Sequence, residues 1–225
     1  MPTKSELAKI NALHYKLVQG DKKDVKKATK KVNKLGYEID TLKRGVASFK
    51  STDPNDKHLI VALKGTNPKN IKDVKSDLKL AVGMSGGDKQ FRHRQKEIKK
   101  IYAANPDTDK YLTGHSLGAA SALSAITKSK SIRDNTKQAV LFNTGATPAF
   151  NAELQKDLSK ENKKELKQKV LQHHVKGDII SESLTIGQQI GKVKTQKAKA
   201  GSAHSLSQFH ADKTLKTDEP MVAEE

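Results

Sequence analysis

The sequence of 225 residues contains no cysteine and no tryptophan, and only four tyrosines and five phenylalanines. The lack of cysteine excludes a disulfide-stapled domain, a thiolate nucleophile and a cysteine-bound zinc site. No apolar run approaches the roughly 20 residues that a membrane-spanning helix needs, and mean hydropathy is −0.72. The length suits one well-packed domain and is short for two.

Arginine is also scarce, although the chain is strongly basic. Lysine and arginine number 43 against 25 acidic residues, a formal net charge of +18, yet only Arg44, Arg92, Arg94 and Arg133 are arginine. Specific nucleic-acid readout favours the planar guanidinium and aromatic stacking platforms, so we expect no specific nucleic-acid site. A diffuse lysine surface gives solubility and a salt-sensitive attraction to polyanions.

The N-terminal stretch Met1–Gly20 has scattered polar residues and no continuous apolar core. We therefore expect no secretory signal peptide, and neither end carries a lipidation motif. The expected location is intracellular and cytoplasmic, with association with a virus particle as the alternative.

Two helices are predicted at the N-terminus, because apolar residues recur at helical spacing over Ser5–Val18 and over Asp21–Leu35. The second of them has lysine at nearly every other position, and residues 1–50 carry 13 basic and 5 acidic side chains. We expect residues 1–36 to pack on the main domain. Their basic face is either simply solvated or attracted to anionic membranes.

From residue 37 onward, strand and helix patterns alternate. Strands are predicted over Tyr37–Leu42, Gly45–Phe49, His58–Leu63, Lys110–Thr113, Ala139–Phe142 and Lys169–Val175. Helices are predicted over Asn70–Leu80, Phe91–Ala104, Leu117–Lys128 and Asn151–Lys167, and Lys192–Ala200 is predicted as a polar connection. This alternation predicts an α/β domain over 37–210, with a mostly parallel central sheet and helices on both faces, and an acidic, flexible tail over 211–225.

The stretch Gly114-His115-Ser116-Leu117-Gly118 carries the chemistry. A serine between a strand and a helix, with glycine two residues before and two after it, is typical of a nucleophile elbow. The glycines let strand and helix approach, and the helix start directs its N–H groups at a developing oxyanion. The pattern predicts Ser116 as the nucleophile, with a structural Gly-Ser turn as the alternative.

This stretch resembles the elbow of the α/β-hydrolase fold, and the wider chain resembles the class 3 (fungal lipase-like) lipases. The other segments that carry the resemblance, in the family's order, are Ile60–Thr66, Phe142–Pro148, Val175–Ile180, and Ala203–Ser205 with Phe209. The resemblance implies a lipase-type carboxylic ester hydrolase that needs no cofactor.

A serine nucleophile requires a base and an acid that orients the base, and in this fold the chain order is Ser, Asp, His. Asp178 follows a predicted strand on a Gly-Asp turn. The resemblance favours His204 as the base, and His210 is the competing histidine. His173 and His174 lie within a strand and are interpreted as packed side chains. No grouping has convincing metal-ligand spacing, so we expect no metal site.

The oxyanion is expected to bind the Leu117 backbone N–H and, by the resemblance, Thr66. Related lipases carry a lid with large apolar residues after this position, whereas Asn67–Asp77 has no aromatic residue. A lid this polar buries little surface, so we expect weak activation at a triglyceride interface.

The sequence therefore predicts a serine acyl-hydrolase that acts on lipid esters, with the basic surface favouring anionic phospholipid membranes. Two alternatives remain open. One is a basic structural or packaging protein with a vestigial hydrolase core, and the other is a non-lipid esterase or thioesterase with the same residues.

Overall fold

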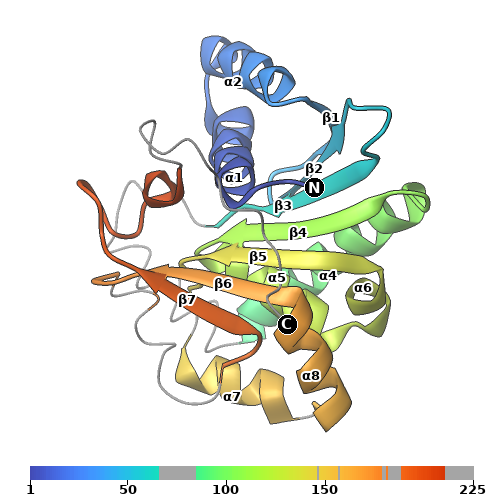
Figure 1. Cartoon of the computed structure of the whole chain (residues 1–225), viewed down its shortest axis with the longest axis vertical. Coiled ribbons are helices and arrows are strands. Elements are labelled where there is room, and N and C mark those ends of the chain that lie inside the picture. The colour runs from blue at the N-terminus through green and yellow to red at the C-terminus, as the bar shows by residue number, and fades with distance from the viewer. Residues whose placement is uncertain (66–84, 146, 157, 179–180, 182–188, 211–225) are drawn as a thin grey trace.

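The structure, a computed structural model, describes residues 1–65, 85–145, 147–156, 158–178, 181 and 189–210 (Figure 1). Its strands are β1 (Tyr37–Leu42), β2 (Val46–Ser51), β3 (His58–Leu63), β4 (Asp109–His115), β5 (Thr136–Phe142), β6 (Val170–Val175) and β7 (Lys192–Gln196). Its helices are α1 (Lys4–Gln19), α2 (Lys22–Lys34), α4 (Ser85–Ala104), α5 (Leu117–Lys128), α6 (Lys130–Asn135), α7 (Pro148–Lys156), α8 (Lys160–Lys169) and the 3₁₀ helix η2 (Leu206–Phe209).

The strands form one sheet in which they lie in the order of the sequence. β2 pairs antiparallel with β1 and β3, whereas β3 through β7 are parallel neighbours. The mostly parallel sheet predicted from the sequence is thus confirmed, with an antiparallel hairpin at one edge. Because parallel strands share a direction, the carboxyl ends of β3, β4, β5 and β6 meet at one edge of the sheet, where open sheets bind their ligands.

The sheet separates two apolar cores, and β3 shows how one strand serves both. Leu59, Val61 and Leu63 contact the core beneath α4, α5 and α8, while Ile60 and Ala62 contact the core beneath α1, α2 and η2. All five side chains are buried, because side chains alternate between the faces of a strand covered on both sides. Helices lie on both faces of the sheet, as expected (Figure 1).

The two N-terminal helices pack on one face of this sheet. α1 starts at a capping box formed by Thr3 and Glu6, and it buries Leu7 and Ile10 completely. α2 buries only Ala28 and Val32 and presents its lysines to solvent. None of the helices in the described part of the chain combines the length and the apolar character needed to cross a bilayer.

The structure differs from the sequence expectation in several described elements. α6 was not expected, and α4 begins at Ser85 and not at Phe91. A strand, β7, lies within Lys192–Ala200, and as the last strand in the sheet order it keeps polar, partly exposed side chains that conceal the usual apolar alternation. The single helix expected over Asn151–Lys167 is two helices, α7 and α8, with Ser159 capping the second. The helix expected over Asn70–Leu80 and the tail 211–225 lie outside the described residues.

Candidate active site

Ser116 lies at a sharp turn between β4 and α5, at the carboxyl edge of the sheet. Its backbone has φ 56° and ψ −127°, a left-handed conformation that is strained for a residue with a side chain. A Cβ on Gly114 would lie 2.7 Å from the Gly118 carbonyl carbon, and a Cβ on Gly118 would overlap the Leu63 carbonyl oxygen. The glycines predicted to flank a nucleophile elbow are therefore sterically required here.

The surrounding backbone holds the elbow in place. The Ser116 N–H donates to the Phe142 carbonyl at 3.1 Å, and the Gly145 N–H donates to the Ser116 carbonyl at 3.1 Å. Gly65, just after β3, lies so close that a Cβ there would be 2.6 Å from the His115 carbonyl oxygen and 3.2 Å from the Ser116 Cβ. The Ser116 hydroxyl is itself buried and has no hydrogen-bond partner in the described part of the chain.

Asp178 and His204, 26 residues apart, meet at the same edge of the sheet. The His204 Nδ1 lies 3.0 Å from both carboxylate oxygens of Asp178. Asp178 is 2% exposed and also accepts a hydrogen bond from the Ser181 hydroxyl at 2.8 Å. An imidazole whose Nδ1 faces a buried carboxylate directs its Nε2 away from that carboxylate, as a general base requires.

The His204 loop lies directly against the elbow. The His115 ring is 4.8 Å from the His204 ring, centroid to centroid, and the His115 Nε2 is 2.7 Å from the His204 carbonyl oxygen. The structure therefore brings together the predicted elbow and the predicted acid and base segments. Thr66, the expected side-chain donor to the oxyanion, lies outside the described residues.

The other histidines show no described contact with Asp178 like that of His204. His210 follows η2, and burial, followed by the positive charges of Lys9 and Lys199, lowers its pKa. His173 stacks on Phe142 at 5.9 Å, and burial lowers the pKa of His173 to about 3.

Asn143, at the end of β5, is a buried residue whose role the sequence did not reveal. Its backbone has φ 42°, its side-chain amide donates to the Ala203 carbonyl at 2.9 Å, and its amide oxygen accepts from the Val175 N–H at 3.0 Å. One side chain therefore ties the loop of His204 to the strand end that precedes Asp178. A polar residue directly after a buried apolar strand is the only sequence signal for it.

Two buried cations lie behind the elbow. Lys64 and Arg94 are 6% and 5% exposed, and Arg94 donates to the Ser121 hydroxyl on α5 at 2.9 Å. Burial, followed by the positive charges of Arg94 and Arg44, lowers the pKa of Lys64 to about 8. Positive charge near the first turn of α5 adds to the field that favours an anion at the elbow.

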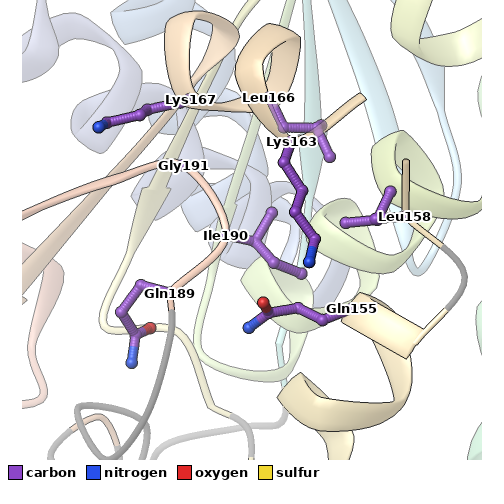
Figure 2. A pocket seen from close by; sticks show the side chains of 8 residues that line it. All are labelled: Gln155, Leu158, Lys163, Leu166, Lys167, Gln189, Ile190 and Gly191. Carbon is purple, nitrogen blue, oxygen red and sulfur yellow. The ribbon is translucent and has the colours of Figure 1, made fainter. Parts of the chain in front are cut away.

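The described residues hold no group of three or more histidine and acidic side chains suited to a metal ion. A cavity of about 320 Å³ lies between α7, α8 and the residues before β7, lined by Leu158, Lys163, Leu166 and Ile190 among others (Figure 2). α8 and Gly191 precede β6 and β7 in the chain, so the cavity is near the amino ends of these strands. The elbow is at their carboxyl ends, and the cavity therefore does not belong to the candidate site.

Comparisons with known proteins bear on the fold. The fold resembles the LIP2 lipase of Yarrowia lipolytica, with a TM-score of 0.56 and 14% identity over 87% of this chain and 78% of that one. It also resembles lipase II from Rhizopus niveus, with a TM-score of 0.52 and 17% identity over 89% and 81% of the two chains. No curated protein matches the chain in sequence.

A sequence model of the Tle-like phospholipase domain matches residues 20–222, which is nearly the whole chain. The match includes β1 through η2, the elbow and both loops that meet beside it. The chain therefore belongs to the Tle-like phospholipase domain family, and it is a carboxylic ester hydrolase with an α/β-hydrolase fold.

Proposed function

We propose that the protein hydrolyses lipid esters through a Ser116–His204–Asp178 triad. The observation that carries this proposal is the contact between the His204 Nδ1 and the Asp178 carboxylate, at 3.0 Å. The loop of His204 also contacts the elbow of Ser116, through His115. A serine hydroxyl is a poor nucleophile at neutral pH unless a base accepts its proton, and the three residues supply nucleophile, base and orienting acid.

In the proposed reaction, the Ser116 hydroxyl attacks the ester carbonyl and passes its proton to the His204 Nε2. The tetrahedral intermediate collapses to an acyl-enzyme as His204 returns the proton to the leaving alcohol. His204 then activates a water molecule that attacks the acyl-enzyme and releases the carboxylic acid. Asp178 keeps the imidazole oriented and stabilises it while it is charged.

The oxyanion is proposed to bind the Leu117 N–H, the first N–H of α5, together with Thr66. The Ser116 side chain does not accept a hydrogen bond from the first N–H groups of α5, as a capping side chain would. Each such donor typically contributes around 3 kcal/mol to stabilisation of the transition state.

The proposed substrate is a phospholipid ester at an anionic membrane surface. The family membership supports a phospholipid, and the basic side chains support the anionic surface. α2 presents seven exposed lysines, and none forms an ion pair with a described residue: Lys22, Lys23, Lys26, Lys27, Lys30, Lys31 and Lys34. Lysines close to an anionic bilayer each contribute about 1 kcal/mol to binding.

The test of the reaction is hydrolysis of phospholipids, triglycerides and soluble short-chain esters by the wild type and Ser116→Ala. We expect phospholipid turnover that is abolished in Ser116→Ala, together with labelling of Ser116 by a fluorophosphonate. Equal turnover by both proteins would refute the triad. Turnover of soluble esters or thioesters alone would favour the non-lipid alternative.

The test of the surface is binding to vesicles that contain anionic phospholipid. Changing Lys23, Lys26, Lys27 and Lys30 to Gln should weaken binding strongly at low salt. The matched control changes four lysines of α8, which packs on the opposite face of the sheet from α2, to Gln: Lys160, Lys163, Lys164 and Lys167. Equal weakening by both sets would contradict docking through α2, and tight DNA binding without ester hydrolysis would favour the packaging alternative.

A further inference from the structure

Tyr15, on α1, reaches across to the end of β3 and to the elbow. Its hydroxyl oxygen accepts a hydrogen bond from the Gly65 N–H at 2.9 Å and lies 3.3 Å from the His115 Nδ1. The ammonium of Lys64 lies 5.0 Å from the centroid of its ring, within the range of a cation–π contact. One side chain of the N-terminal helix therefore contacts both segments that converge on Ser116.

The positions of the hydrogen atoms in this series of hydrogen bonds, from Gly65 through Tyr15 and His115 to His204, follow from which atoms can donate and which can only accept. The Tyr15 oxygen already accepts from Gly65, so its own hydrogen is free to point at the His115 Nδ1. The His115 Nε2 faces the His204 carbonyl oxygen at 2.7 Å, and a carbonyl can only accept. Burial lowers the pKa of His115 to about 3, so the ring is neutral at pH 7 and carries one hydrogen. That hydrogen must therefore be on Nε2.

We propose that Tyr15 is a positioning residue, whose hydroxyl donates to the Nδ1 of the Nε2–H tautomer of His115 and holds that ring in the orientation in which its Nε2 secures the His204 loop against Ser116. The proposal rests on the triad proposed above. In the other tautomer, the His115 Nε2 lone pair would face the lone pairs of the His204 carbonyl and repel the loop. Tyr15 acts through His115 and is not expected to touch the substrate.

Tyr15 lies ahead of residues 20–222, the part of the chain matched by the family model. The sequence places it on a helix that packs on the domain, without a role in the site. The proposal thus assigns to α1 a function in catalysis in addition to its contribution to the core.

The chain contains a matched control for this contact. The Tyr37 hydroxyl lies 3.0 Å from the Nε2 of His58, and the two rings meet edge to face at 5.4 Å. The Tyr37–His58 pair is also buried, but it lies at the amino end of β3, the far end of that strand from the elbow. Tyr37→Phe therefore removes the same kind of hydrogen bond without changing the site.

The experiment compares Tyr15→Phe with Tyr37→Phe for kcat, KM and Tm. We expect Tyr15→Phe to lower kcat roughly tenfold to a hundredfold with KM nearly unchanged, because the lost bond positions the base for the transition state. Tyr37→Phe should keep kcat within about twofold at a similar change in Tm. Equal kcat values for the two variants would overturn the proposal.

A double-mutant cycle tests whether Tyr15 acts through His115. His115→Gln removes the ring that Tyr15 orients, so Tyr15→Phe should lower kcat less than about threefold in the His115→Gln background. The full factor in that background would overturn the proposal.

The tautomer itself can be read without activity, from ¹⁵N chemical shifts of the His115 ring, assigned by comparison with His115→Gln. Both proteins should show a protonated Nε2, and the wild type alone should show the displaced Nδ1 chemical shift that a hydrogen bond from Tyr15 causes. A protonated Nδ1 in the wild type would overturn the proposal. This readout is independent of the Ser116→Ala result, so failure of the positioning role and failure of the triad can be told apart.

Discussion

The nucleophile elbow and the Asp178–His204 pair occupy the same edge of the sheet, but they are built in different ways. The elbow is local: five consecutive residues, with two glycines that no larger residue can replace, force Ser116 into its turn. The pair is assembled from two loops 26 residues apart and is supported by hydrogen bonds from Asn143 and His115. The elbow is therefore shaped by the lack of space for larger side chains, and the Asp178–His204 pair by hydrogen bonds between buried polar groups.

The largest expected effect comes from breaking the pair itself. Asp178→Asn keeps the size of the side chain but replaces the carboxylate that we propose to orient the His204 ring and to stabilise its charge. We expect kcat to fall about 10⁴-fold with little change in fold, as expected for loss of the acid of a triad. Ester hydrolysis and a thermal melt measure the two quantities. A fall of less than tenfold would mean that His204 does not depend on Asp178.

Breaking the elbow should act on stability rather than on chemistry alone. In Gly118→Ala the new methyl group overlaps the Leu63 carbonyl, so β3 and α5 must move apart. We expect a loss of about 3 kcal/mol in the free energy of unfolding, the upper range for overpacking. Urea unfolding measures it.

The control for this variant is Gly201→Ala. Gly201 has φ +99° with no atom within 4 Å of a new Cβ, so only conformational strain is added there. That strain should cost about 1 kcal/mol. Equal losses for the two variants would contradict a steric role for Gly118.

The support of the pair gives a third prediction. Asn143→Ala leaves the Val175 N–H and the Ala203 carbonyl without their side-chain partner. We expect a loss of about 2 kcal/mol in the free energy of unfolding, and a fall in kcat, because both loops of the proposed triad lose an anchor. Unfolding and kinetics on the same preparation test this. Unchanged kcat in a destabilised protein would restrict Asn143 to a structural role.

The last prediction concerns pH. Burial lowers the pKa of His173 to about 3, against about 6.5 in an unfolded chain. Below pH 6.5 the unfolded state therefore binds more protons than the folded state, so stability is lost as the pH falls from 6.5 towards 3. The slope approaches about 1.4 kcal/mol per pH unit for such a histidine. His173→Phe, which keeps a ring against Phe142, should give a flatter dependence of unfolding free energy between pH 6.5 and 4.5; an identical slope would contradict this.

Much of the fold was accessible to sequence reasoning because its signals are local. The apolar run over β3 and the small residues of α5 indicated a covered parallel sheet, and the glycines at 114 and 118 marked the elbow between strand and helix. β7 escaped this reasoning because a polar edge strand has no apolar alternation. The break between α7 and α8 escaped it because both halves carry helical patterns.

The sequence indicated an aspartate and a histidine as acid and base, in that order along the chain. It did not indicate that the two side chains meet. A Gly-Asp turn and a loop histidine are common, and only the fold decides whether Asp178 and His204 meet. Tyr15 carried no usable signal, and Asn143 only its place directly after a buried strand, since a buried amide or hydroxyl is informative only once its partners are known.

The sequence by itself determined the elbow and the charge of the molecule, because a glycine requirement and a lysine count depend on adjacent residues and on composition. Tertiary structure decided which histidine meets a carboxylate and which side chains hold that pair in place. Those contacts join segments up to 100 residues apart, as Tyr15 and His115 show. Their geometry depends on how strands and helices pack, and no local pattern records it.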